Sequence, residues 1–130
     1  MRLKKRWGAR AIAGARHLSN LRELDLSANH VGAAGALALA KSRTLTNLSE
    51  LILSRCEIDD EGAAAIAGSL YLEGLQTLDL SDGKIDNTGA LAVANSKTLT
   101  RLVVLSLRDN AFDNSAHKGL RESYGKRVQM

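Results

Sequence analysis

The sequence predicts an α/β solenoid, in which short parallel strands form one face and helices form the other. The first observation is a 27-residue period, at which leucines, glycines and alanines recur over most of the 130-residue chain. The second is a short stretch of alternating apolar and polar residues in each period, typical of a half-buried strand. The third is an alanine-rich stripe with helical spacing after each stretch. One such unit cannot bury its own apolar face, so consecutive units must stack.

Four columns of leucine define the repeat. Each column has four members, and one full period separates consecutive members. The columns are Leu18, Leu45, Leu72 and Leu99; Leu21, Leu48, Leu75 and Leu102; Leu24, Leu51, Leu78 and Leu105; and Leu26, Leu53, Leu80 and Leu107.

One unit reads L-x-x-L-x-x-L-x-L-x-x-N-x-I-x-x-x-G-A-x-x-L-A. It resembles a leucine-rich repeat, and its half with glycine before a helix resembles the ribonuclease-inhibitor-like subclass of bacterial type. The resemblance covers residues 8 to about 120. It implies a leucine-rich repeat solenoid, a short curved horseshoe arc with a parallel β-sheet of about four strands on the concave face and α-helices on the convex face. The motif is specific for architecture and nearly silent on ligand identity.

The elements follow in order along this repeat. Ala9, Ile12 and Ala13 predict a helix before the first strand. Each strand is predicted where leucines alternate with polar residues, and each later helix follows a polar N-cap candidate. These candidates are Asp59 or Asp60, and Asp86, Asn87 or Thr88. Residues 1–130 form a single domain with an N-terminal helix or cap (1–17), full repeats (18–44, 45–71 and 72–98), a partial repeat (99–119) and a C-terminal cap or tail (120–130).

Both ends depart from the repeat. No strand is expected upstream of the first helix, because Arg2 and Lys4 stand one period before Asn29 and Val31. Residues 3–10 and 120–127 resemble one another, and both are candidate caps over the core ends. The first segment is alternatively the junction to an upstream part of a longer array, and the sequence leaves both alternatives open.

The basic residues are concentrated at the ends. Residues 1–16 carry six basic residues and no acidic one, whereas residues 17–113 carry 8 basic and 13 acidic residues. The net charge of +4 is therefore a poor argument for nucleic acid as a partner. No stretch approaches the ~20 apolar residues of a membrane span, and no apolar signal-peptide core follows the basic start. We expect a cytoplasmic protein, monomeric unless exposed solenoid ends self-associate.

The candidate binding site is the concave sheet face. Side chains that alternate with the core leucines point to this face, and core packing is not expected to fix them. Glu23 and Glu50 should stand side by side on adjacent strands, which favours a basic protein or peptide partner; a solvated acidic face is the alternative. The candidate residues are Glu23, Asp25, Ser27, Glu50, Ile52, Ser54, Arg55, Thr77, Asp79, Ser81, Asp82, Val104, Ser106 and Arg108.

Catalytic, cofactor and metal sites are not expected. The exposed carboxylates lack the burial that separates the pKa values of an acid–base pair, and no Ca²⁺ loop gathers them. The three histidines show no zinc spacing. Cys56 falls in the column of Asn29 and Asn110. The resemblance to leucine-rich repeats implies that side chains of this column bond to backbone, so we expect a buried, structural thiol, and Gly83 should weaken the column locally. Leu37 and Leu91 look outward from the helices, either to fill grooves or to form a small patch.

The sequence therefore predicts a non-enzymatic protein–protein interaction module that binds through an acidic concave face. One alternative is an electrostatic binder of nucleic acid or anionic membrane through the basic termini. Another is a fragment of a longer repeat protein without independent function.

Overall fold

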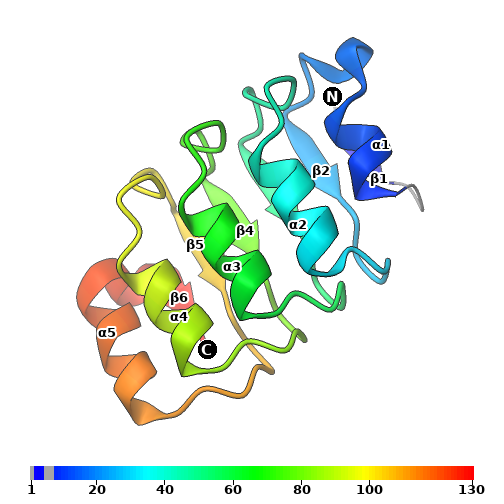
Figure 1. The fold of residues 1–130 in the computed structure, drawn as a ribbon. Coiled ribbons are helices and arrows are strands. Elements are labelled where there is room, and N and C mark those ends of the chain that lie inside the picture. Colours follow the sequence, from blue (N-terminus) through cyan, green and yellow to red (C-terminus); the bar gives the residue numbers. More distant parts are fainter. Residues whose placement is uncertain (1, 5–7) are drawn as a thin grey trace.

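The computed structural model describes residues 2–4 and 8–130, and for residues 2–4 it describes the backbone. Two layers stack along one direction (Figure 1): a parallel sheet of six strands in the order β1-β2-β3-β4-β5-β6, and helices side by side on one of its faces. The predicted α/β solenoid is confirmed. The elements are β1 Arg2–Lys4, α1 Ala9–Ala13, a 3-10 turn Arg16–Leu18, β2 Glu23–Asp25, α2 Gly32–Ala40, β3 Glu50–Ile52, α3 Asp60–Ala67, β4 Thr77–Asp79, α4 Asn87–Ala94, β5 Val104–Ser106, α5 Asn114–Tyr124, a 3-10 turn Gly125–Arg127, and β6 Val128–Gln129.

The strands pair in the register that the period of the repeat predicts. Leu24 pairs with Leu51, Leu51 with Leu78, and Leu78 with Leu105. All sixteen leucines of the four columns are at most 4% exposed and belong to one core cluster. Burying that many large aliphatic side chains, at about 1.5–3 kcal/mol each, dominates the stability of the solenoid.

The sheet has one strand more at each end than the four strands of the repeat, and β1 corrects the expectation that no strand lies upstream of the first helix. In β1, Leu3 pairs with Leu24, and in β6, Val128 pairs with Leu105. Less than one period separates the partners of each pair, so neither strand falls into the columns of the repeat. A parallel strand needs only its backbone in register with its neighbour, and the shorter connections supply that.

The N-cap predictions are confirmed for one candidate in each group. The side chain of Asp59 accepts a hydrogen bond from the Gly62 N–H of α3, and that of Asp86 accepts one from the Thr88 N–H of α4. Gly62 also lets α3 approach α2 closely, since a Cβ at this position would lie 3.1 Å from the Cβ of Ala36. The glycine column therefore sets the spacing between helices.

A column of serines, which was not predicted from the sequence, links consecutive helices. In each link, a serine Oγ–H, after a helix or in the last turn of α5, donates to the carbonyl of the alanine that ends the preceding helix, at 2.5–2.6 Å. In three of the four links, the same hydroxyl accepts backbone N–H bonds from the turn that follows. Each serine thereby satisfies a helix end that would otherwise lack a donor. The pairs are Ser42–Ala13, Ser69–Ala40, Ser96–Ala67 and Ser123–Ala94.

The C-terminal segment continues the last helix. Helix α5 crosses the predicted boundary between residues 119 and 120, because Leu120 and Tyr124 bury against the core. The Tyr124 hydroxyl donates to the Val93 carbonyl at 2.7 Å, and burial raises the pKa of this phenol. The Arg127 guanidinium donates to the carbonyls of Leu102 and Ser123 and so holds the segment onto the last repeat.

Candidate protein-binding face

The predicted site residues lie on the face of the sheet that the helices leave uncovered. The leucines that alternate with them are buried, which fixes the opposite direction for their neighbours. In register across β2 to β5, one row is Glu23, Glu50, Thr77 and Val104, and the next is Asp25, Ile52, Asp79 and Ser106. The structure therefore brings the predicted columns together on four adjacent strands.

Glu23 and Glu50 are neighbours in the register of β2 and β3, as predicted, and both are partly buried. Directly opposed like charges destabilise a sheet unless another group compensates them. Neither carboxylate is without a partner in the chain. The pair is therefore part of an existing polar network, rather than two bare charges waiting for a cation.

The side chains of these columns were expected not to be fixed by core packing, but those of Asp25 and Asp79 are held in place by local hydrogen bonds. Asp25 is only 7% exposed, and its Oδ1 accepts bonds from the N–H and the hydroxyl of Ser27 at 2.9 and 2.5 Å. Asp79 accepts the same two bonds from Ser81 at 2.8 and 2.6 Å. Each carboxylate closes the turn at the end of its strand, an Asx-type arrangement that competes with contact to a ligand.

The other predicted residues range from buried to exposed. Ser106 is buried, and the Ser81 hydroxyl donates to the Ser54 hydroxyl at 3.1 Å between the segments that follow β4 and β3. Ile52, Thr77 and Val104 are partly buried. Arg108 is exposed at the end of β5.

Arg55 and Asp82 stand on the rim, where the chain turns from strand to loop. Both have positive φ, 55° and 52°, as do Ala28 and Asp109 in the same column. The left-handed conformation is costly for residues other than glycine, asparagine and aspartate. The repeat needs it at this position in order to leave the strand, so the rim side chains project in a fixed direction.

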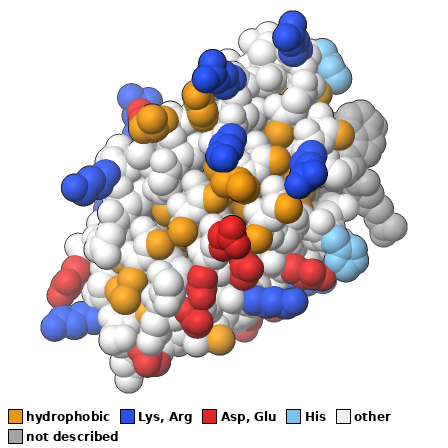
Figure 2. All heavy atoms as spheres, viewed as in Figure 1, with side chains coloured by type: hydrophobic (Ala, Val, Ile, Leu, Met, Phe, Trp, Pro, Cys, Tyr) orange, Lys and Arg blue, Asp and Glu red, His pale blue; other side chains and the backbone are white. Residues whose placement is uncertain are grey.

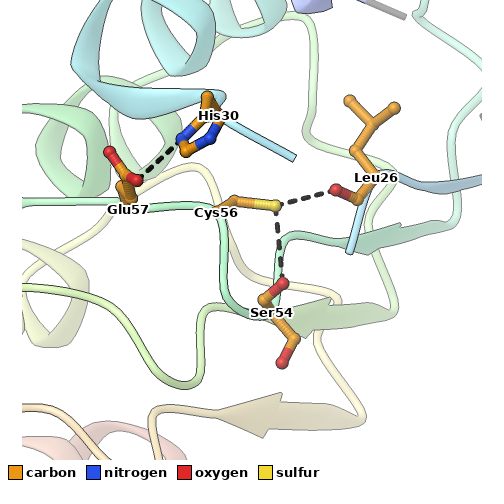
Figure 3. Close-up of polar contacts among 5 residues, drawn as sticks. All are labelled: Leu26, His30, Ser54, Cys56 and Glu57. Atoms are coloured by element: carbon orange, nitrogen blue, oxygen red, sulfur yellow. Dashed lines mark hydrogen bonds and ion pairs between the residues drawn. The ribbon is translucent and has the colours of Figure 1, made fainter. Parts of the chain in front are cut away.

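Cys56 lies in the predicted backbone-bonding column (Figure 3). It is fully buried, and its thiol donates to the carbonyl of Leu26 at 2.9 Å and to that of Ser54 at 3.5 Å. Burial raises the pKa of the thiol, which keeps it protonated and unreactive. The amide groups of Asn29 and Asn110 donate to backbone carbonyls in the same column. The structural role predicted for Cys56 is confirmed.

Gly83 has no side chain to bond, but backbone groups close this turn. The N–H of Lys84 donates to the Ile58 carbonyl at 2.7 Å, and that of Ile85 donates to Asn110 Oδ1 at 3.1 Å. A Cβ on Gly83 would lie 2.6 Å from the Ile58 carbonyl oxygen. The turn is thus closely packed around a glycine. This packing was not part of the expectation that Gly83 merely weakens the column.

Asp60, the first residue of α3, and Asp86, the N-cap of α4, have pKa values that move apart. Asp60 Oδ1 accepts from the N–H groups of Asp86 and Gly89. Burial raises the pKa of Asp60, and its side-chain bond to Asp86 raises it further; that same bond lowers the pKa of Asp86, as does the bond from the Thr88 N–H. The backbone bonds identify the pair as a helix cap shared between repeats.

His30 and His117 make local contacts. His30 Nδ1 lies 2.8 Å from Glu57 Oε1 at the outer edge of the loops (Figure 3), and His117 packs edge-on against Phe112. Over residues 2–4 and 8–130, no three His, Cys, Asp or Glu side chains group as metal ligands would. Over the same residues, no helix has the length and apolarity needed to cross a membrane.

A stack of short parallel strands that displays columns of side chains on an open face defines a repeat-built scaffold. The model of the leucine rich repeat family matches residues 17–40, 44–67 and 75–94, just over half of the chain. The chain therefore belongs to the leucine-rich repeat family, whose repeats generally mediate protein–protein interaction and whose members are typically non-enzymatic binding modules. A search of curated protein sequences finds no match.

Proposed function

We propose that the chain is a non-enzymatic module that binds a basic protein or peptide through its concave sheet face. The observation that carries this proposal is the register of β2 and β3, which sets Glu23 beside Glu50 on the uncovered face of the sheet, in the same row as Thr77 and Val104. A lysine or arginine of a partner would join the polar network that both carboxylates already form within the chain. The half-buried side chain of Ile52, on the same strand as Glu50, would contact the aliphatic part of that residue.

Asp25 and Asp79 support this site indirectly. Their carboxylates hold Ser27 and Ser81, so we assign them to positioning the turns rather than to direct contact with the partner. The specificity of the face would then come from Glu23, Glu50 and the apolar side chains next to them.

The ribonuclease-inhibitor-like subclass, bacterial type, is part of the proposal. The glycine near the start of each helix supports it, since Gly35 and Gly62 let neighbouring helices pack closely. The free, buried thiol of Cys56 supports a reducing compartment, and we propose the cytoplasm.

The test is a titration of a short fluorescent peptide rich in lysine and arginine, followed by anisotropy. The double variant Glu23→Gln and Glu50→Gln should weaken binding by about tenfold, because two charge-assisted contacts are lost. The matched control, Glu73→Gln with Glu122→Gln, removes the same charge at exposed positions off the face and should leave the affinity unchanged. Equal losses in both double variants would mean that net charge alone drives binding.

The basic N-terminus provides the competing outcome. Lys5 and Arg6 lie outside the described residues, and the predictions made for them remain untested. Binding of DNA or anionic vesicles that disappears in Lys5→Gln with Arg6→Gln, and not in the Glu23 and Glu50 variant, would assign recognition to the terminus instead.

A further inference from the structure

The loop between α3 and β4 departs from the repeat at its most exposed point. Leu70 is 71% exposed, the highest value among the exposed large hydrophobic residues of the described chain. The equivalent positions of the neighbouring repeats, one period before and one period after, hold Arg43 and Lys97. Cations are the residues expected near the negative end of a helix dipole, which is where this position lies. Leu70 therefore gives up a favourable charge and places an apolar side chain in water.

Leu70 does not stand alone. With Leu37, Ala65 and Tyr71 it lines a largely apolar groove of about 250 Å³ between the ends of α2 and α3. Tyr71 replaces the threonine that both neighbouring repeats carry at its position. Leu37 is 38% exposed, so the groove does not bury it. Of the two alternatives for Leu37, the patch is favoured. Leu91 is exposed to almost the same extent, 37%, although its Cδ2 lies near α5, 3.2 Å from where a Cβ on Gly119 would stand.

The surroundings of the groove are basic. Lys41 lines it directly, and Arg43 and Lys97 occupy the positions equivalent to Leu70 in the adjoining repeats. Figure 2 shows lysine and arginine over the upper part of this face and most of the aspartate and glutamate over its lower part. The acidic residue of the same loop is Glu73, which is exposed.

We propose that this groove, centred on Leu70, binds an acidic peptide segment of a partner protein with a large apolar anchor residue. The anchor would enter between Leu37, Leu70 and Tyr71, and the acidic residues beside it would pair with Lys41, Arg43 and Lys97. The charge of the rim selects the class of partner, and the cavity selects the anchor. The groove lies on the helical side of the solenoid, so it is independent of the concave face. It would bind acidic peptides, whereas the concave face would bind basic ones.

The test starts from a random peptide library displayed on phage, selected on the immobilised full chain and counter-selected on Leu70→Arg. That substitution restores the kind of side chain that the neighbouring repeats carry, and the site is exposed, so the variant should melt cooperatively like the unmodified chain. We expect acidic peptides with one or two large apolar residues. In anisotropy titrations of the most enriched peptide, Leu70→Arg should weaken binding by about tenfold or more, since burying one leucine is worth that factor.

Two further variants separate the contributions. Lys41→Glu should also weaken the peptide, which identifies the charge preference. Val103→Ser removes another exposed apolar side chain, away from the groove, and should leave binding unchanged. Glu23→Gln with Glu50→Gln should leave it unchanged as well, so this proposal and the concave-face proposal fail separately.

Several results would overturn the proposal. They are selection of no peptide over the Leu70→Arg background, selection of basic or uncharged peptides, and equal loss of binding in Val103→Ser. Dimers in sedimentation that Leu70→Arg dissociates would assign the groove to a second copy of the chain. Binding to vesicles of phosphatidylglycerol and phosphatidylcholine that depends on Leu70 would assign it to a membrane surface.

Discussion

Replacing Gly83 with asparagine restores the residue that Asn29 and Asn110 carry at the equivalent positions. From the repeat pattern alone this change should stabilise the protein, because a side-chain amide would complete the column of backbone hydrogen bonds. The structure predicts the opposite. A Cβ at position 83 would lie 2.6 Å from the Ile58 carbonyl oxygen and 2.9 Å from Asn110 Oδ1, whereas ordinary contact begins at 3.4 Å.

The magnitude follows from what has to move. Both crowded oxygens already accept backbone hydrogen bonds, from the N–H groups of Lys84 and Ile85. Overpacking costs about 1–3 kcal/mol, and stretching one of these bonds costs about 1 kcal/mol more. Restricting the unfolded chain returns about 0.4–1 kcal/mol, and a new amide bond returns about 1 kcal/mol. We therefore expect Gly83→Asn to destabilise by about 1–2 kcal/mol and Gly83→Ala by about 2–3 kcal/mol.

Urea unfolding followed by circular dichroism measures both changes, and about 1 kcal/mol corresponds to about 4 °C in Tm for a chain of this length. Asn110→Gly is the matched control, since it removes a side chain with established bonds and should also destabilise. A rise in the urea midpoint of Gly83→Asn would refute the reasoning, because it would mean that the turn relaxes without cost.

Three further changes test other parts of the structure. Ser69→Ala should lower the unfolding free energy by about 1–3 kcal/mol, because the buried Ala40 carbonyl loses its donor; an unchanged urea midpoint would contradict this role. Ala28→Gly should raise it by about 0.5 kcal/mol, because the relief of a positive φ exceeds the added chain entropy, and a lower Tm would argue against backbone strain at the rim. Asp113 has a pKa below its usual 3.8, chiefly because the Asn87 side chain hydrogen-bonds to it. Because the pKa of Asp113 is lowered in the folded state, its ionised carboxylate stabilises the fold above pH 3.8, and this stabilisation is lost as the pH falls through the folded-state pKa. Acidification below pH 3.8 should therefore cost the parent chain more stability than it costs Asp113→Asn; equal losses would contradict this.

The repeat period predicted what depends on periodic burial. The leucine columns fixed the strands β2 to β5, the helices between them and the neighbouring positions of Glu23 and Glu50. Strand β1 was not predicted, because its pairing depends on backbone register, and backbone register produces no apolar column in the sequence. The turn formed by Asp25 with Ser27 was not predicted for a different reason: alternation gives the direction of a side chain but not its local hydrogen bonds.

The serine column was visible and overlooked. Ser42, Ser69, Ser96 and Ser123 recur at the same period as the leucines. Their role could be recognised only once each hydroxyl was seen to reach a carbonyl 29 residues earlier in the chain. The exposed Leu70 was visible as well, as an apolar residue in a column of cations, but it acquires meaning only beside the groove that Leu37 and Tyr71 complete.

The serine links also make the chain extendable. Each link joins a donor in one repeat to an acceptor in the repeat before it, so a duplicated unit carries both halves of the connection. A second copy of residues 45–71 inserted after residue 71 would offer its own Ser69 equivalent to the helix before it and its own Ala67 equivalent to Ser96. The leucine columns would continue through the insert without a change of register. Lengthening this protein is therefore a matter of copying one segment, with no new junction to design.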